Sequence, residues 1–447
     1  NIPSSVYDVS AKEFKDATAW DVSAAQDKSI IAWYTKNANE SIKVYIGSED
    51  EIFGNTDSSY LFNCIGNSEL CTATEAITNI SLLNVGNVTN MDRMFRNTGY
   101  NAMTSLNLGD NFDTSNVTNM SGMFARTGYK KMKTFDLGSN FDTSQVTNMS
   151  YMFVHTGAAV MEVLDLKGKF DTSAVTDMSY MFNLTGYTSM KTLNLGKAFN
   201  TSIVENMSGM FLNTGFTAMT SLDLGSEFKT AKVKDMSYMF ANTGHNAMTS
   251  LKLGSEFDTT LVTNMREMFN GCGQAELTSL DLGTKFNTKN VTNMNAIFAN
   301  CGTKITKLDL GDVFYTTKVK DMYHMFYNCG SSLMTELDLG PAFTRIPNDS
   351  ITGTSKDVNG DNVPAHNGYD GMFDETGKPA EIKIQVSEQI YLDKNDFKLN
   401  TDATDSIINY TRGTINPKYR TEWLKEASAL AIDKNNLENG KITVTLR

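Results

Sequence analysis

The stretch Asp-Thr-Ser-Asn-Val-Thr-Asn-Met-Ser-Gly-Met-Phe, at residues 113–124, returns with small changes at eight other places in this 447-residue chain. Its valine recurs seven times at a spacing of 29 residues and once at a spacing of 28. The nine positions are Val88, Val117, Val146, Val175, Val204, Val233, Val262, Val291 and Val319. A repeat of this length is one supersecondary unit that cannot bury its own apolar face and must stack on its neighbours. The chain is therefore predicted to be a solenoid.

Apolar residues occupy fixed columns of the repeat. Methionine fills the third place after the valine in every repeat, and the sixth place in all but the one that carries Ile297. Phenylalanine follows directly after the sixth place in every repeat. Of the 25 methionines, only Met372 lies outside the repeat columns, which is typical of a repeated core and not of a metal-binding surface. We expect these columns to form ladders in the interior.

The spacing within each repeat predicts two short elements. Val117, Met120 and Met123 are three residues apart, which places them on one face of a helical turn. Asn119 suits the N-cap of this turn, and the glycine column that includes Gly128 suits its end. Residues 104–108 alternate polar and apolar side chains as a strand does. The predicted fold class is an α/β leucine-rich-repeat solenoid, with a ladder of parallel strands beside short helical turns.

The repeat resembles that of the BspA-like leucine-rich-repeat proteins of bacterial cell surfaces. The resemblance rests on the motif at 113–124 and its eight further copies. Ile-Ala-Trp-Tyr at 31–34 and Ser-Ser-Tyr-Leu-Phe at 58–62 also look like the lead-in of that family, so the likeness covers roughly residues 20–380. It implies an exported, non-enzymatic protein that binds ligands on a host or a neighbouring cell, and it names no ligand.

The periodicity divides the chain into four parts. An uncapped solenoid would expose apolar edges, so the irregular segment before Val88 is expected to seal that end. The parts are an N-terminal capping region at 1–87, nine repeats at 88–343, a loop insertion with a degenerate tenth repeat at 344–380, and a small C-terminal module at 381–447.

Shorter patterns predict elements at both ends of the chain. In the capping region we expect a helix at 11–20 and strands at 30–34 and 42–46. The C-terminal module is expected to be β-rich or α+β. Its predicted elements are strands at 382–386 and 441–446 and a helix at 416–430.

Composition limits the partners. The chain has 51 acidic and 39 basic residues, and its net charge of −12 repels phosphate backbones and anionic lipids. We therefore expect no nucleic-acid partner. No run of 18 apolar residues is present, so no membrane span is expected. The family resemblance places the protein at the bacterial cell surface, and we expect its signal peptide and anchor to lie outside these residues and the protein to be monomeric.

The cysteines fall into two groups. Cys272, Cys301 and Cys329 occupy a column that holds threonine in the earlier repeats. Side chains in register on parallel coils rarely present the dihedral angle of a disulfide, so we expect free, buried thiols there. Cys64 and Cys71 are close in sequence within the capping region. The sequence is compatible both with a disulfide between them and with two free thiols.

No catalytic or metal-binding constellation emerges. The histidines His155, His245 and His324 fall at three different places of the repeat, and His366 falls in a loop. No HExxH motif, nucleophile elbow or glycine-rich phosphate loop is present. Residues 357–361 have calcium-ligand spacing at three positions, but the glycine and the bidentate glutamate are misplaced, which favours a turn. We expect no enzyme activity, cofactor or metal.

An acidic column is the first candidate binding surface. It lies on the strand, one place before the last leucine, and is mainly aspartate. Adjacent like charges oppose one another, so a cationic partner would stabilise them, whereas the simpler interpretation is a solvated face. The column is Asn107, Asp136, Asp165, Asn194, Asp223, Lys252, Asp281, Asp309 and Asp338.

An aromatic column is the second candidate. It follows the glycine that ends the turn and is aromatic only in the first part of the array. Aromatic side chains in loops are common anchors for sugars and proteins, and edge packing that shields the turn is the rival interpretation. The column is Tyr100, Tyr129, Ala158, Tyr187, Phe216 and His245, then Gln274, Thr303 and Ser331.

Together these observations favour a non-catalytic, adhesin-like surface protein that presents a rigid repeat face to a host protein or glycan. A structural stalk or spacer of a cell-wall-associated protein is one alternative. The accessory domain of a larger surface hydrolase is another.

Overall fold

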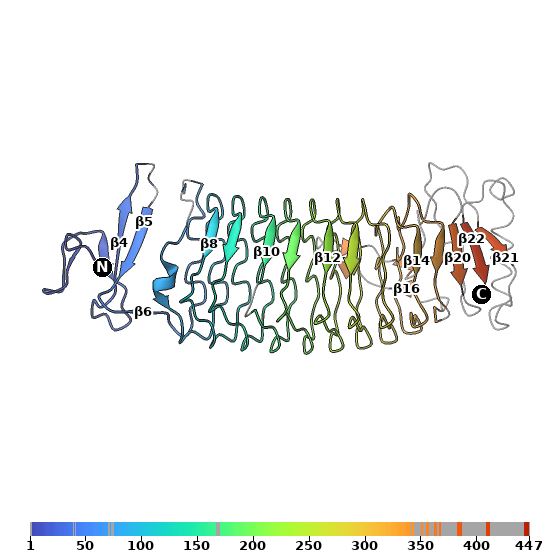
Figure 1. Cartoon of the computed structure of the whole chain (residues 1–447), viewed down its shortest axis with the longest axis horizontal. Coiled ribbons are helices and arrows are strands. Elements are labelled where there is room, and N and C mark those ends of the chain that lie inside the picture. The colour runs from blue at the N-terminus through green and yellow to red at the C-terminus, as the bar shows by residue number, and fades with distance from the viewer. Residues whose placement is uncertain are drawn as a thin grey trace.

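The protein is an elongated stack of coils with a small sheet at its N-terminal end (Figure 1). The computed structural model describes residues 2–38, 40, 42–69, 72, 76–166, 170–340 and 342–343, together with seven short strands between 350 and 446.

Most coils contribute a short strand to a parallel ladder, as predicted, although the equivalent residues 279–281 form no strand. Paired strands lie one repeat apart and in register, so that Leu106 pairs with Phe135 and Leu164 with Leu193. The central residue of a strand is buried in most coils and its neighbours face outward. The strands are β8 Ser105–Asn107, β9 Thr134–Asp136, β10 Val163–Asp165, β11 Thr192–Asn194, β12 Ser221–Asp223, β13 Ser250–Lys252, β14 Lys307–Asp309 and β15 Glu336–Asp338.

The predicted helical turns are wrong. Where the helix was expected, alternate backbone N–H groups donate to the next coil, as in Arg93 N to Ser121 O at 2.8 Å. The intervening N–H groups close tight turns within the coil, as in Met94 N to Met91 O at 3.1 Å. Within the part of the chain that the structure describes, the only helix is the 3-10 turn η1, Ile80–Leu82. The molecule is therefore a β-solenoid and not an α/β leucine-rich-repeat fold.

Left-handed backbone explains why no helix forms. The fifth, ninth and eleventh residues after the valine have positive φ in all nine repeats, for example Arg93 at 52°, Asn97 at 57° and Gly99 at 59°. An α-helix of L-residues excludes such angles. The asparagine expected to cap a helix instead closes a turn, because Asn119 Oδ1 accepts the N–H of Ser121 at 3.1 Å. Equivalent residues from Asp57 to Asp321 also form an unbroken series of parallel bridges.

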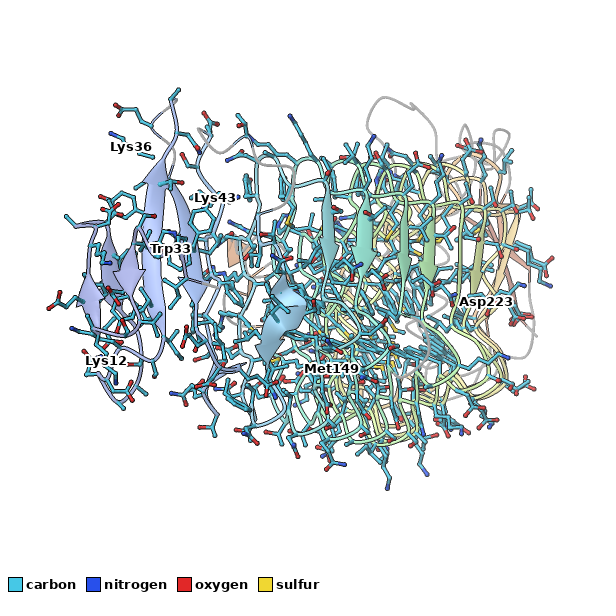
Figure 2. All side chains as sticks on the ribbon, turned by 60° about the vertical axis from the view of Figure 1, so that its left-hand side comes forward. Lys12, Trp33, Lys36, Lys43, Met149 and Asp223 are labelled. Atoms are coloured by element: carbon cyan, nitrogen blue, oxygen red, sulfur yellow. The ribbon has the colours of Figure 1, made fainter. Side chains whose placement is uncertain are left out.

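The interior consists of ladders of identical side chains. Phe153 is fully buried and stacks on Phe124 and Phe182, with ring centroids 5.6 Å apart in both cases. Met149 lies within the stacked coils, whereas Asp223 lies on the outside of the strand ladder (Figure 2). Buried threonine hydroxyls donate to a neighbouring coil, as in Thr127 Oγ1 to Phe95 O at 2.8 Å and Thr114 Oγ1 to Asp142 O at 2.7 Å. The predicted core columns are confirmed.

The three cysteines in the threonine column are free and fully buried, as predicted. Burial raises the pKa of the Cys301 thiol to about 12, and it raises the pKa values of Cys272 and Cys329 well above the usual range. Cys64 is an exposed free thiol, and Cys71 lies outside the described residues, so the structure contains no bridge at Cys64.

Because the thiolate is the reactive form and the folded protein both buries and protonates it, all three buried cysteines should react slowly with iodoacetamide in the native protein. They should react rapidly in denaturant. Mass spectrometry of timed, quenched samples measures both rates, and a Cys301–Cys329 disulfide in protein kept from oxidation would contradict the prediction.

The N-terminal region is a sheet followed by an extra coil. The strands predicted at 30–34 and 42–46 are confirmed as β4, Ile31–Lys36, and β5, Ile42–Gly47, which pair antiparallel. The helix predicted at 11–20 is wrong, because Asp16 Oδ1 accepts the N–H of Thr18 and closes a turn there. The remaining strands are β1 Tyr7–Asp8, β2 Glu13–Phe14, β3 Ala19–Asp21, β6 Ile52–Phe53 and β7 Leu83–Asn84.

The segment from Asp57 to Gly66 forms a coil of its own. Asp57 bridges Asn90, and Phe62 stacks on Phe95 at 5.3 Å. The core ladder therefore begins one coil before Val88.

The parallel sheet continues into the C-terminal part. β20, Ile382–Val386, pairs with β15, and β22, Ile442–Leu446, pairs with β20 and with β21, Ile408–Thr411. The strands predicted at 382–386 and 441–446 are thus confirmed. The insertion holds the antiparallel pairs β16 Ser350–Ile351 with β19 His366–Asn367, and β17 Ser355–Lys356 with β18 Asn362–Val363. The predicted helix at 416–430, the degenerate tenth repeat and the turn at 357–361 lie outside the described residues.

Candidate binding surfaces

The aromatic column forms two stacks at a corner of the coils. Tyr100 and Tyr129 lie nearly parallel, with ring centroids 4.7 Å apart. Tyr187 stacks on Phe216 at 4.8 Å, and Phe216 stacks on His245 at 4.4 Å. All five side chains are half-buried, so each ring uses part of its surface for packing and leaves part in solvent.

Between the two stacks the column holds Ala158, which is only 2% exposed. His155, in the same coil, packs against Tyr129 with ring centroids 5.6 Å apart. Its Nδ1 is buried and has no hydrogen-bond partner among the described residues. Burial, assisted by the charge of Arg126, lowers the pKa of His155 to about 4, so the ring is neutral near pH 7. Ala158 and the neutral His155 ring therefore contribute an uncharged, partly apolar surface between the stacks.

The side chains of the acidic column stabilise a turn, which was not predicted from the sequence. Its side-chain oxygens accept the N–H of the glycine two residues later, as in Gly225 N to Asp223 Oδ1 at 3.0 Å and Gly311 N to Asp309 Oδ1 at 2.9 Å. Such bonds close the turn that ends the strand. Asp136, Asp223, Asp281 and Asp309 are exposed, and Asp165 is half-buried.

Two members of this column depart from a uniform acidic ladder. Asp338 is only 2% exposed, so it does not belong to an outward-facing surface, and the prediction for that residue is wrong. The reason is that β15, which carries it, is followed in the sheet by β20. Lys252 forms an ion pair with Asp223 at 3.4 Å and interrupts the negative charge.

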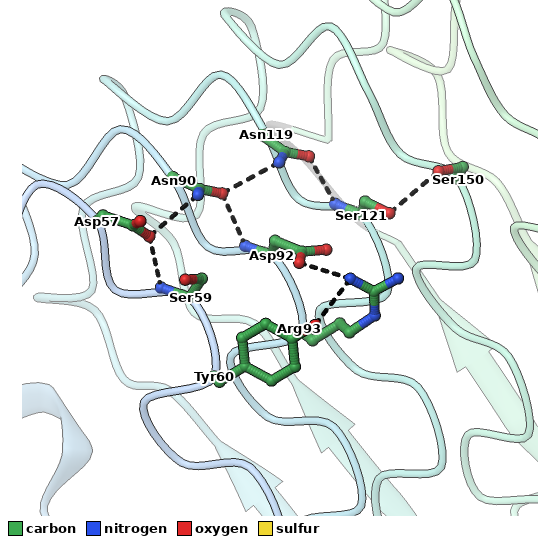
Figure 3. Close-up of polar contacts among 9 residues, drawn as sticks. All are labelled: Asp57, Ser59, Tyr60, Asn90, Asp92, Arg93, Asn119, Ser121 and Ser150. Carbon is green, nitrogen blue, oxygen red and sulfur yellow. Dashed lines mark hydrogen bonds and ion pairs between the residues drawn. The ribbon is translucent and has the colours of Figure 1, made fainter.

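A third surface was missed from the sequence. The fifth place after the valine carries Tyr151, Tyr180 and Tyr238, all with left-handed backbone, and Tyr60 holds the same place in the coil before Val88. Arg93 Nη1, in the next coil, donates to Tyr60 Oη at 3.0 Å and to Asp92 Oδ2 at 2.7 Å (Figure 3). The signal was the alternation of Met-Ser-Gly-Met-Phe with Met-Ser-Tyr-Met-Phe among the repeats.

Comparison with known families finds a family that matches three overlapping stretches of the chain. The family described as "Mycoplasma protein of unknown function, DUF285" matches residues 66–184, 157–254 and 244–337, which together span more than half of the chain. The chain belongs to the DUF285 family. The matched residues cover most of the repeat array of this DUF285 protein. No curated protein and no solved structure matches it.

Two further properties bear on the chemistry of this DUF285 protein. Within the described part of the chain, no three histidine, cysteine, aspartate or glutamate side chains gather where they could hold a metal ion. Over the same residues, no helix has the length and apolar character needed to cross a bilayer.

Proposed function

We propose that this DUF285 protein is a non-catalytic, adhesin-like binding protein of a bacterial cell surface, whose rigid repeat face contacts a host protein or a glycan. One observation carries the proposal: Tyr100, Tyr129, Tyr187 and Phe216 stand at a surface position that the fold does not require to be aromatic. The same column holds polar residues such as Thr303 in later coils, and those coils stack in the same way. Partly exposed aromatic rings on a rigid scaffold are typical anchors of a binding surface. The resemblance of the repeat to BspA-like surface proteins supports the same proposal.

A spacer is the second candidate. The continuous stack in Figure 1 would hold another domain at a distance from its attachment point. A spacer needs no aromatic column, so binding experiments separate the two proposals.

Changing Tyr100, Tyr129 and Tyr187 together to serine should abolish attachment to the ligand of the wild-type protein on an array of glycans and extracellular-matrix proteins. Each aromatic anchor contributes about 2 kcal/mol. The thermal midpoint should stay nearly unchanged, because polar residues occupy this column elsewhere. A matched control changes Gln274 and Thr303 of the same column to serine and should keep full binding.

If the acidic column carries the contact instead, binding should weaken steeply as salt rises and should survive loss of the tyrosines. Full-strength, salt-insensitive binding by the triple variant would exclude both columns.

A further inference from the structure

A cluster of basic side chains interrupts the acidic surface near the N-terminal end of the array. Residues 93–133 contain six arginines and lysines and only two aspartates, although the net charge of the chain is −12. Four of the six, Arg126, Lys130, Lys131 and Lys133, are close in sequence, and all four are exposed. We call these four residues the basic corner. Exposed charges more than about 8 Å apart are largely screened at physiological salt, so the basic corner and not the net charge decides which ligands this surface attracts.

Acidic neighbours neutralise little of the basic corner. Lys130 Nζ lies 3.7 Å from Glu69 Oε1, but the Glu69 side chain is 88% exposed, and ion pairs of this kind are weak. Glu162 holds the place of Lys133 in the next coil and pairs instead with Lys191 at 3.0 Å. The other three members of the basic corner have no ion-pair partner among the described residues. Their charges are therefore available to a ligand.

The basic corner adjoins the first tyrosine stack. Lys130 Nζ lies over the Tyr100 ring, 5.8 Å from its centroid, and Tyr100 stacks on Tyr129. The charge of Arg126 acts on the ring of His155, which packs against Tyr129. A cation thus lies near each of the two tyrosines, whose rings are half-buried and keep part of their surface in solvent.

Backbone hydrogen bonds hold the basic corner in place. Met132 N donates to Gly128 O at 3.1 Å and closes a turn. This turn carries Lys130 and Lys131, and Lys130 N also donates to Tyr100 O in the preceding coil at 2.9 Å. A surface whose backbone is already fixed loses less conformational entropy when it binds a partner.

The second aromatic stack has no such neighbours. In the coil of Tyr187, the places of Lys130 and Lys131 hold Thr188 and Ser189. The combination of stacked rings with several cations is therefore specific to the first stack and is not a general property of the repeat.

We propose that the basic corner and the stack of Tyr100 and Tyr129 together bind a sulfated glycan chain. Sulfate groups would accept charge-assisted hydrogen bonds from Arg126 and the lysines. The C–H faces of the sugar rings would pack on the solvent-exposed parts of the tyrosine rings. An acidic polypeptide would pair with the cations but offers no sugar ring to the tyrosines. The inference rests on the proposed binding function and deepens it by naming the ligand class.

The full chain is titrated over immobilised heparin, a sulfated polysaccharide, and surface plasmon resonance measures the affinity at several salt concentrations. The wild-type protein should bind, and its affinity should fall as salt rises, because salt screens the ionic contacts. Changing Lys130, Lys131 and Lys133 together to glutamine should weaken the affinity about tenfold or more. Changing Tyr100 and Tyr129 together to serine should weaken it as well. Thermal midpoints should stay nearly unchanged, because the lysines are exposed and the tyrosine column holds polar residues in later coils.

The matched control changes Lys229, Lys232 and Lys234 together to glutamine. This variant loses the same positive charge from another coil, where Lys229 pairs with Glu227 at 3.0 Å and Lys234 pairs with Glu205 at 2.7 Å. It should keep wild-type affinity for heparin. Equal weakening in both lysine variants would show that the overall charge governs binding and would overturn the site.

Two further polymers test the ligand class. Dextran, a neutral polysaccharide, and polyglutamate, an acidic polypeptide, should each bind at least about tenfold more weakly than heparin. Equal binding of polyglutamate would overturn the assignment to a glycan, and unchanged heparin affinity in the tyrosine variant would overturn the part given to the stack. Failure of the wild-type protein to bind heparin would overturn the whole inference, whereas attachment to another glycan or to a matrix protein would leave the proposed function intact.

Discussion

Replacing Phe153 by alanine should lower the free energy of unfolding by about 3–5 kcal/mol. The Phe153 ring is fully buried and contacts phenylalanines of the coils on both sides, so its removal leaves a cavity that two interfaces share. Equilibrium urea denaturation, followed by circular dichroism, measures the loss.

Val163→Ala is the control for this experiment, because Val163 lies on β10 in the same coil and is 51% exposed. A substitution at an exposed residue of this kind should change the free energy of unfolding by about 0.5 kcal/mol or less. Losses below 1 kcal/mol at Phe153 as well would show that the phenylalanine column is not a buried ladder.

Two glycines with the same backbone angle should differ sharply when each is changed to alanine. Gly138 and Gly225 both have a φ of 77°, so alanine at either site carries the left-handed cost of about 1–2 kcal/mol. A Cβ at Gly138 would also collide with the Gly109 carbonyl oxygen, whereas a Cβ at Gly225 would meet nothing within 4 Å. A backbone collision adds about 1–3 kcal/mol.

The expected losses are therefore about 2–5 kcal/mol for Gly138→Ala and about 1–2 kcal/mol for Gly225→Ala, measured by the same urea denaturation. Equal losses would show that the turns at 109 and 138 do not approach as closely as the structure has them.

The interior of the solenoid could be predicted because burial imposes the same requirement on every coil. The valine, methionine and phenylalanine columns mark the inward positions, and the alternation around Leu106 marks the strand. The path of the chain between those positions could not be predicted from spacing alone. A helical turn would direct Val117, Met120 and Met123 into the interior. The observed series of tight turns, hydrogen-bonded to the next coil, also buries all three side chains.

The evidence against a helix lay in positions that the spacing argument either left out or assigned to the end of the helical turn. Gly122 and Gly209 at the fifth place, asparagine at the ninth in coils such as that of Asn97, and glycine at the eleventh are all residue types that tolerate positive φ. Their recurrence at the fifth, ninth and eleventh positions indicates left-handed residues spaced through the segment.

The candidate surfaces were predicted in part. The sequence identifies the aromatic column because its members recur, but it does not reveal that the rings of Tyr187 and Phe216 pack on each other. The sequence also does not distinguish an aspartate whose side chain closes a turn, such as Asp223, from an aspartate whose side chain is available to bind a ligand. Tyr151 was missed because its place falls on the outer side of the expected helix, where any residue is tolerated.

The uniform separation between contacting residues has a consequence for inheritance. β8 pairs with β9, and Phe124 stacks on Phe153, at 29 residues apart in both cases. Closing a loop of that size costs the same conformational entropy in the first coil as in the last, so the search for contacts in each coil does not grow with the number of coils. When recombination adds or removes one repeat in the gene, the length of the solenoid changes. The contacts between the remaining neighbouring coils keep the same form. Length is the property that this architecture can alter most readily over generations.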